Sequence, residues 1–222
     1  MTTTTECRRT TFGGLTIDHD DTVLEPRTWT LLQSDWAVDL SAAVPDGPVL
    51  ELCCGVGHIG LEAVRRAARP LVQVDVCESA CEFARRNALA AGLADRVEIR
   101  CADLADLRSS DERYPLVLAD PPYLRSDRVH DHPSDPLRAI DGGPDGLALL
   151  RQCLDVIDAV LLDDGAALVQ VAGMDQAMDL GPLLAETLHI AEVREHDPHR
   201  AVLLVERRPS TTMPRRPRGD RS

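Results

Sequence analysis

The chemistry that this sequence could perform is concentrated in four consecutive residues: Asp120, Pro121, Pro122 and Tyr123. The two prolines fix two φ angles and remove two N–H donors, which leaves the Asp120 carboxylate and the Pro121 carbonyl as rigid acceptors. Each acceptor can take one hydrogen of a planar –NH2 group, so that the nitrogen lone pair turns toward a methyl donor. The Tyr123 ring can lie flat on the amide or base that carries the nitrogen. The alternative interpretation is a proline-rich strand end followed by a loop.

A second group of residues forms a turn that could hold a nucleoside. Residues 49–60 read VLELCCGVGHIG, a short apolar run followed by a glycine-rich turn and the start of a helix. Gly55 and Gly57 let the backbone turn sharply and approach a ligand closely. Asp75 ends the next apolar run, where a carboxylate can accept hydrogen bonds from ribose hydroxyls. Such turns also serve as plain strand-to-helix connections, but together with Asp75 this one favours a nucleotide or nucleoside.

Two further acidic residues bear on which nucleoside is bound. A dinucleotide and S-adenosylmethionine both suit the turn. Glu51, inside the strand that leads into the turn, would repel a pyrophosphate but suits a ligand with an ammonium and a sulfonium group. Asp103 follows the third predicted strand, where it could meet an adenine amino group. A cap of a helix or turn is an equally good interpretation of Asp103.

These residues need a scaffold that brings strand ends together. Short apolar runs alternate with helical patterns between residues 48 and 207, which predicts an α/β fold with a doubly wound, mostly parallel sheet. The predicted strands are 49–53, 71–75, 97–101, 115–119, 166–171, 190–195 and 201–206, and the predicted helices are 58–68, 79–90, 145–162 and 175–188. A short polar connection joins the last two strands, so we expect them to pair antiparallel. The carboxyl ends of the parallel strands would then face one crevice.

We expect three segments along the chain. Residues 48–207 form the catalytic domain. Residues 1–47 are too few for a large second domain and are predicted to be a cap or lid over the edge of the sheet, with a helix around 30–43. Residues 208–222 are rich in arginine, proline and Ser/Thr, which is typical of a disordered tail.

Composition excludes several classes of protein. Apolar residues make up 44% and charged residues 27%, as in ordinary globular chains, and no apolar run approaches the ~20 residues that span a bilayer. The first residues lack the apolar stretch of a secretory signal, so we expect a cytoplasmic location. The net charge of −13 argues against broad nucleic-acid binding, although the arginine-rich tail could contact RNA. The seven cysteines form no CxxC pair and no zinc-like set with histidines, so no metal is expected.

The sequence resembles a known family at several of these motifs. It is similar to class I S-adenosylmethionine-dependent methyltransferases of the small methyltransferase domain type, and most similar to the release-factor glutamine N5-methyltransferases. Residues 23–30 (VLEPRTWT) resemble the family's I-P-R-x-x-T segment. Residues 128–133 (RVHDHP) resemble its V-R-D-H-x-P loop, and residues 139–147 (AIDGGPDGL) its A-L-D-G-G-x-D-G-L segment. The likeness covers about residues 20–207.

The resemblance implies a Rossmann-like seven-stranded sheet with an antiparallel last strand, and a role for each matched residue. Glu51, Gly55 and Gly57 would surround the methionine part of S-adenosylmethionine, Asp75 would hold its ribose, and Asp103 would lie near its adenine. Residues 120–123 would hold the acceptor nitrogen.

Two departures from the family concern the substrate. The family's catalytic motif usually begins with asparagine, whereas here it begins with Asp120, as in enzymes that methylate exocyclic amines of adenine or guanine. The family also carries a helical substrate-recognition domain, for which the first 47 residues are too short.

We therefore expect an S-adenosylmethionine-dependent N-methyltransferase that acts on an amide or amino nitrogen, with a protein glutamine side chain as the favoured acceptor. Methylation of an exocyclic base amine in RNA or DNA is the first alternative. A non-catalytic cofactor-binding protein is the second, and the intact motif at Asp120 counts against it.

Overall fold

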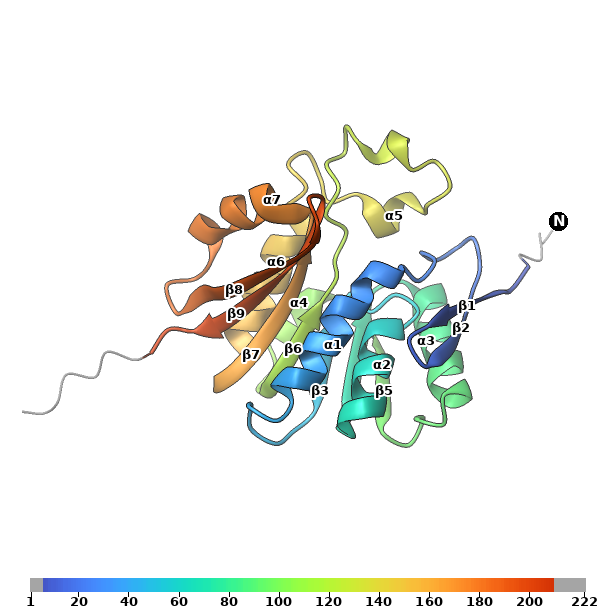
Figure 1. Cartoon of the computed structure of the whole chain (residues 1–222), viewed down its shortest axis with the longest axis horizontal. Helices are drawn as coiled ribbons and strands as arrows, with labels where there is room; N and C mark the ends of the chain where they lie inside the picture. Colours follow the sequence, from blue (N-terminus) through green and yellow to red (C-terminus); the bar gives the residue numbers. More distant parts are fainter. Residues whose placement is uncertain (1–5, 210–222) are drawn as a thin grey trace, which may run out of the picture.

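A central sheet of seven strands runs through the computed structural model, which describes residues 6–209 (Figure 1). The strands are Val49–Leu52 (β3), Leu71–Asp75 (β4), Val97–Cys101 (β5), Tyr114–Ala119 (β6), Leu161–Val171 (β7), Leu188–Asp197 (β8) and Arg200–Arg207 (β9). Their order across the sheet is β5-β4-β3-β6-β7-β9-β8. Neighbours from β5 to β7 pair in parallel, whereas β9 pairs antiparallel with both β7 and β8. The predicted doubly wound sheet with an antiparallel last strand is confirmed.

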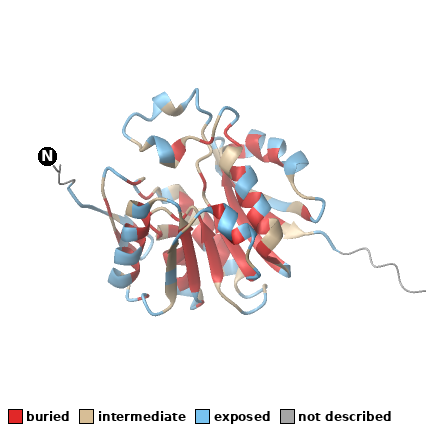
Figure 2. Cartoon of the chain, turned by 180° about the vertical axis from the view of Figure 1, so that it is seen from behind, coloured by how far each residue is buried: buried red, intermediate tan, exposed pale blue. Residues whose placement is uncertain are grey.

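Alternating apolar side chains along the strands supply a core on each face of the sheet. In β6, Leu116 and Leu118 are buried in one core, while Val117 and Ala119 are buried in the other. This period of two is expected for a strand that is covered on both faces. Figure 2 shows the strands as a buried layer, with helices that are buried only on the side toward them.

Helices cover both faces of the sheet. Leu31–Leu40 (α1), His58–Ala67 (α2) and Glu78–Ala90 (α3) share one core, and Leu104–Arg108 (α4), Ala148–Val160 (α6) and Gly173–Leu180 (α7) share the other. The remaining elements are the short helix Leu137–Ile140 (α5) and the 3-10 turns Thr28–Thr30, Val129–Asp131 and Gly181–Leu183. The helix predicted over 175–188 is shorter in the structure, because Pro182 lacks the N–H that would continue it.

The N-terminal segment begins with a β-hairpin that the sequence analysis missed. Arg8–Phe12 (β1) and Leu15–His19 (β2) pair antiparallel through a two-residue Gly-Gly turn, in which Gly13 has φ +55°. Such a turn between apolar residues is a hairpin signal. The hairpin packs against α3, and α1 packs against α2, β6 and β7. Of the segment predicted to cap the edge of the sheet, α1 thus lies on a face of the sheet, where Trp36 is buried. The hairpin lies on the helices that cover this face, with Phe12 and Ile17 buried.

The arginine-rich tail predicted for residues 208–222 lies almost entirely outside the described part of the chain. Between residues 6 and 209, no helix is both long and apolar enough to span a membrane.

Candidate functional site

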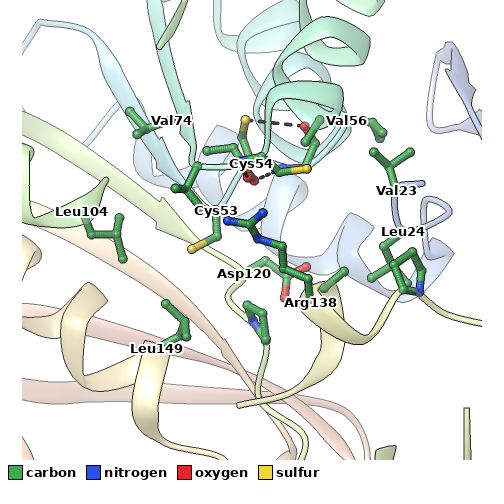
Figure 3. A pocket seen from close by; sticks show the side chains of 18 of the residues that line it. Val23, Leu24, Cys53, Cys54, Val56, Val74, Leu104, Asp120, Arg138 and Leu149 are labelled. Carbon is green, nitrogen blue, oxygen red and sulfur yellow. Dashed lines mark hydrogen bonds between the residues drawn. The ribbon is translucent and has the colours of Figure 1, made fainter. Parts of the chain in front are cut away.

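A pocket of about 330 Å³ lies at the carboxyl ends of β3, β4, β5 and β6 (Figure 3). Each of these four strands contributes a residue at its end: Cys53, Asp75, Asp103 and Asp120. The opposite wall comes from the segment after the hairpin, which includes Leu24, and from the segment around α5. The crevice therefore forms where the sequence analysis places it, at the strand ends of a doubly wound sheet.

The turn after β3 is fixed by positive φ angles and by a carboxylate. Cys53, Gly55 and Gly57 have φ of +55°, +54° and +82°. Asp75 accepts hydrogen bonds from the N–H of Gly55 (2.9 Å) and from the N–H of Cys77 (2.9 Å). The Asp75 side chain thus holds the turn in place while it lines the pocket. Cys53 adopts a left-handed conformation that is strained for a residue with a Cβ atom, and such strain concentrates at functional sites.

Gly57 lies behind the pocket rather than in its lining. A Cβ atom at Gly57 would stand 2.7 Å from the side-chain nitrogen of Gln73, which donates a 2.8 Å hydrogen bond to the Gly57 carbonyl. A glycine is therefore required at position 57 for two reasons: a side chain would collide with Gln73 of β4, and the backbone φ is positive.

Glu51 also lies behind the turn and does not line the pocket. Its buried carboxylate accepts hydrogen bonds from the N–H of Gly60 (3.1 Å), in the first turn of α2, and from the amide of Gln73 (2.6 Å). Burial raises the pKa of Glu51 to about 7. In this structure Glu51 is thus bound to the protein's own backbone at the start of a helix, where an anionic ligand would otherwise bind.

Asp103 has both a capping position and a place in the pocket lining, the two alternatives that its sequence position leaves open. It is the N-cap of α4, because its carboxylate accepts a 2.9 Å hydrogen bond from the N–H of Ala105. It also lines the pocket, beside Ala102 and Leu104.

Asp120 stands at the end of β6, and its carboxylate lines the pocket together with Pro122. No hydrogen bond or ion pair within residues 6–209 involves its side chain. Burial raises the pKa of Asp120 to about 7. A partly desolvated carboxylate with unused acceptor capacity suits a ligand N–H donor.

Tyr123 lies just beyond this carboxylate, outside the pocket lining. Burial, followed by the negative charge of Asp120, raises the pKa of the Tyr123 hydroxyl, which stays protonated at neutral pH. Its backbone carbonyl accepts a 3.0 Å hydrogen bond from Gln176 of α7. Nearby, the guanidinium of Arg200 stacks 3.8 Å from the centre of the Trp29 ring. An aromatic and cationic pair therefore lies close to Tyr123.

Two segments close the pocket from the side opposite the strand ends. Thr22, Val23 and Leu24 come from the N-terminal segment, and Pro136, Arg138 and Ala139 come from α5 and its flank. A partly buried ion pair of 2.6 Å between Arg27 and Asp135 ties the two segments together. The sequence analysis assigned none of these residues a role. Its quoted motifs include Val23, Leu24, Arg27 and Ala139, and leave out Thr22, Asp135, Pro136 and Arg138.

His130 and His132 are exposed on a loop away from the pocket lining. Within the described residues, no cluster of three or more His, Cys, Asp or Glu side chains could hold a metal ion.

The pocket suits a cationic nucleoside. Three carboxylates, those of Asp75, Asp103 and Asp120, line a largely apolar cavity, and Glu51 occupies the helix start that would bind a pyrophosphate. This set of groups fits S-adenosylmethionine, which carries ribose hydroxyls, an adenine amino group, an ammonium and a sulfonium.

Comparison with known proteins identifies methyltransferases as relatives of this chain. A methyltransferase domain family matches residues 49–131. The ribosomal protein uL3 glutamine methyltransferase of Bradyrhizobium diazoefficiens is 33% identical over 189 residues, which are 77% of this chain and 59% of that protein. The release factor glutamine methyltransferase of Mycolicibacterium smegmatis is 34% identical over 169 residues, 72% of this chain and 57% of that protein. The chain thus spans less than two thirds of the length of these relatives.

Solved structures show the same fold at low sequence identity. The ribosomal protein L11 methylase of Lactobacillus delbrueckii subsp. bulgaricus superposes with a TM-score of 0.61 at 16% identity and covers 83% of this chain and 81% of its own. The hMettl16 catalytic domain, in complex with an RNA hairpin, gives a TM-score of 0.67 at 11% identity, with coverages of 88% and 75%. From the fold, the pocket and these relatives together, we conclude that the chain belongs to the class I S-adenosylmethionine-dependent methyltransferases, close to the glutamine methyltransferases of release factors and ribosomal protein uL3.

Proposed function

We propose that this protein transfers a methyl group from S-adenosylmethionine to the side-chain nitrogen of a glutamine in a protein of the translation machinery. The observation that carries the proposal is the Asp120 carboxylate, which lies at the end of β6 in the pocket wall and has no partner among the described residues. Relatives named for glutamine methylation of release factors and of ribosomal protein uL3 support the choice of acceptor.

The site residues divide into those that touch the cofactor and those that shape its turn. We assign the ribose hydroxyls to Asp75 and the adenine end to Asp103, because both acids line the pocket. Gly55 lines the pocket as well and leaves space beside its Cα atom, so the methionine part can pass close to the backbone. Glu51 and Gly57 act through the turn, because their contacts are with Gly60 and Gln73.

At the acceptor end, Asp120 and the Pro121 carbonyl would each accept one N–H of the glutamine amide, and the Tyr123 ring would lie against its plane. When bound, the cofactor supplies an electrophilic methyl group on a sulfonium. The protein then contributes alignment of the nitrogen lone pair with that methyl group, in a pocket from which the bound cofactor and acceptor would displace water. A C–N bond forms as the C–S bond breaks, and the amide proton leaves to Asp120 or to water.

The test is transfer of isotope-labelled methyl from S-adenosylmethionine into release factor, ribosomal protein uL3 and whole-cell extract. Label in protein that survives nuclease, is lost with protease, and maps to a methylated glutamine supports the proposal. Asp120→Ala is the matched control for chemistry, because it removes the acceptor without touching the residues assigned to the cofactor. Binding of S-adenosylmethionine with no transfer to any acceptor would favour a non-catalytic protein and overturn the proposal.

A second candidate is methylation of an exocyclic base amine in RNA or DNA, and the observation that favours it is the aspartate at position 120. The six arginines of residues 207–222 would add phosphate contacts in such a complex. Label that is lost with nuclease rather than protease would select this candidate, and removal of residues 210–222 should then weaken the salt dependence of binding.

A further inference from the structure

Arg138 is held at the mouth of the pocket by the loop that follows the catalytic motif. The N–H of Leu124 donates to the carbonyl of Ile140 (3.0 Å), and the N–H of Gly142 donates to the carbonyl of Leu124 (2.7 Å). The buried side chain of Ile140 anchors the same turn. Because these contacts fix the backbone of α5, the position of Arg138 over the pocket is set by the fold.

The Arg138 side chain points into the pocket. In the view of Figure 3 its guanidinium extends toward the turn at Cys53, and Arg138 and Asp120 both line the pocket. No ion pair or hydrogen bond within residues 6–209 engages this guanidinium. By contrast, Arg125, Arg128 and Arg151 on neighbouring segments each pair with a nearby aspartate.

Arg138 is the only permanent cation among the described residues that line the pocket, which also holds the acids Asp75, Asp103 and Asp120. His58, also in the lining, is neutral at physiological pH because burial lowers its pKa to about 3. An anionic group of a ligand that enters this acidic cavity therefore has a single side chain to pair with.

Three backbone donors beside the pocket are already engaged by side chains of the protein. Backbone N–H groups at turns and at the starts of helices can bind an anion. Here the N–H groups of Gly55, Gly60 and Cys77 already donate to carboxylates of the protein. Glu51 takes the N–H of Gly60, and Asp75 takes the N–H groups of Gly55 and Cys77.

We propose that Arg138 binds the α-carboxylate of the methionine part of S-adenosylmethionine and so sets the position of the sulfonium methyl relative to Asp120. This inference rests on the proposed function, because it takes S-adenosylmethionine as the ligand of the pocket. The carboxylate is attached to the sulfur through a short chain, so it lies near the acceptor end once the methyl group faces Asp120. A planar guanidinium can bind a carboxylate through two parallel hydrogen bonds.

The experiment compares two ligands that differ only in the carboxylate: S-adenosylmethionine and decarboxylated S-adenosylmethionine. Calorimetry gives the dissociation constant of each for the full chain, for Arg138→Gln and for Arg138→Lys. Arg138→Gln should weaken binding of S-adenosylmethionine about 10-fold, the scale of a charge-assisted contact near solvent, and leave binding of the decarboxylated ligand unchanged. Arg138→Lys should fall between, since it keeps the charge but loses the planar fork.

The matched control is Arg128→Gln, which removes a cation of the same loop that pairs with Asp131 and lies outside the pocket lining. It should leave both dissociation constants unchanged. Equal weakening of both ligands by Arg138→Gln would show a role in packing and overturn the inference, as would an unchanged affinity for S-adenosylmethionine. Equal binding of the two ligands by the unaltered protein would also overturn it, while the proposed function would stand. A protein that binds neither ligand would overturn the proposed function itself.

Discussion

Replacement of Asp120 by asparagine should stabilise the folded protein at neutral and alkaline pH. Burial at the end of β6 raises the pKa of this carboxyl to about 7 in the folded state, and no cation pairs with it in the described part of the chain. In the unfolded chain an aspartate has a pKa of about 3.9. Between these two values the folded state holds a proton that the unfolded state releases.

The sign and size of the effect follow from this difference. The free energy of unfolding falls as pH rises wherever the folded state binds more protons, so ionisation of Asp120 costs stability between about pH 4 and pH 7. About three pKa units correspond to a limit of about 4 kcal/mol, and we expect about 1–2 kcal/mol because the side chain borders an open, water-accessible pocket. Asparagine has the same shape and no charge to desolvate. It should therefore be more stable than the unaltered protein by this amount at pH 8, and the gap should close toward pH 4.

The assay is urea unfolding of both proteins without cofactor at pH 4.5, 6, 7 and 8. Glu51, whose pKa burial also raises to about 7, titrates in both proteins. The negative charge of Asp120 contributes to that raised pKa, so its removal in Asp120→Asn lowers the Glu51 pKa and adds to the stabilisation at pH 8. The same difference can be measured by thermal unfolding at pH 8, where the midpoint temperature of Asp120→Asn should be higher by about 2–8 °C, at about 2–4 °C for each kcal/mol in a chain of this size. A difference that does not change with pH, or one that grows toward acid, would refute a buried, unpaired carboxylate at this position.

Three further predictions concern the turn and the acceptor end. Asp75→Ala should weaken S-adenosylmethionine binding by about 1–3 kcal/mol, because it removes both the ribose acceptor and the carboxylate that holds the N–H of Gly55; unchanged affinity by calorimetry in a folded variant would remove Asp75 from the site. Gly57→Ala should cost about 1–3 kcal/mol in urea unfolding, since the new Cβ atom would lie 2.7 Å from the Gln73 amide at a φ of +82°, and a variant as stable as the parent would contradict the turn described above. Asp120→Ala should lower single-turnover methyl transfer by about 10²- to 10³-fold with little change in cofactor affinity, whereas Asp120→Asn keeps measurable turnover. Equal and complete loss in both variants would mean that the negative charge itself is required.

Local patterns were enough to predict the scaffold. Each strand of the sheet was predicted from its local pattern, and β4 and β5 coincide with the predicted ranges. The strand β4 is mostly apolar and buried, whereas β5 (VEIRC) alternates apolar and charged residues. The hairpin before α1 was missed, although its Gly-Gly turn carried the signal. The helix predicted from 175 was too long because the apolar pattern continued past Pro182.

The sequence by itself determined that Asp75, Asp103 and Asp120 lie at one crevice. Each of them follows a predicted parallel strand, and the carboxyl ends of such strands face one crevice in a doubly wound sheet. Only the tertiary structure decided what Glu51 does, because its partners belong to the start of a helix and to the neighbouring strand. Only the tertiary structure placed Arg138 in the lining of the pocket. The approach of a loop to a sheet depends on contacts between residues far apart in the chain, and no local periodicity records them.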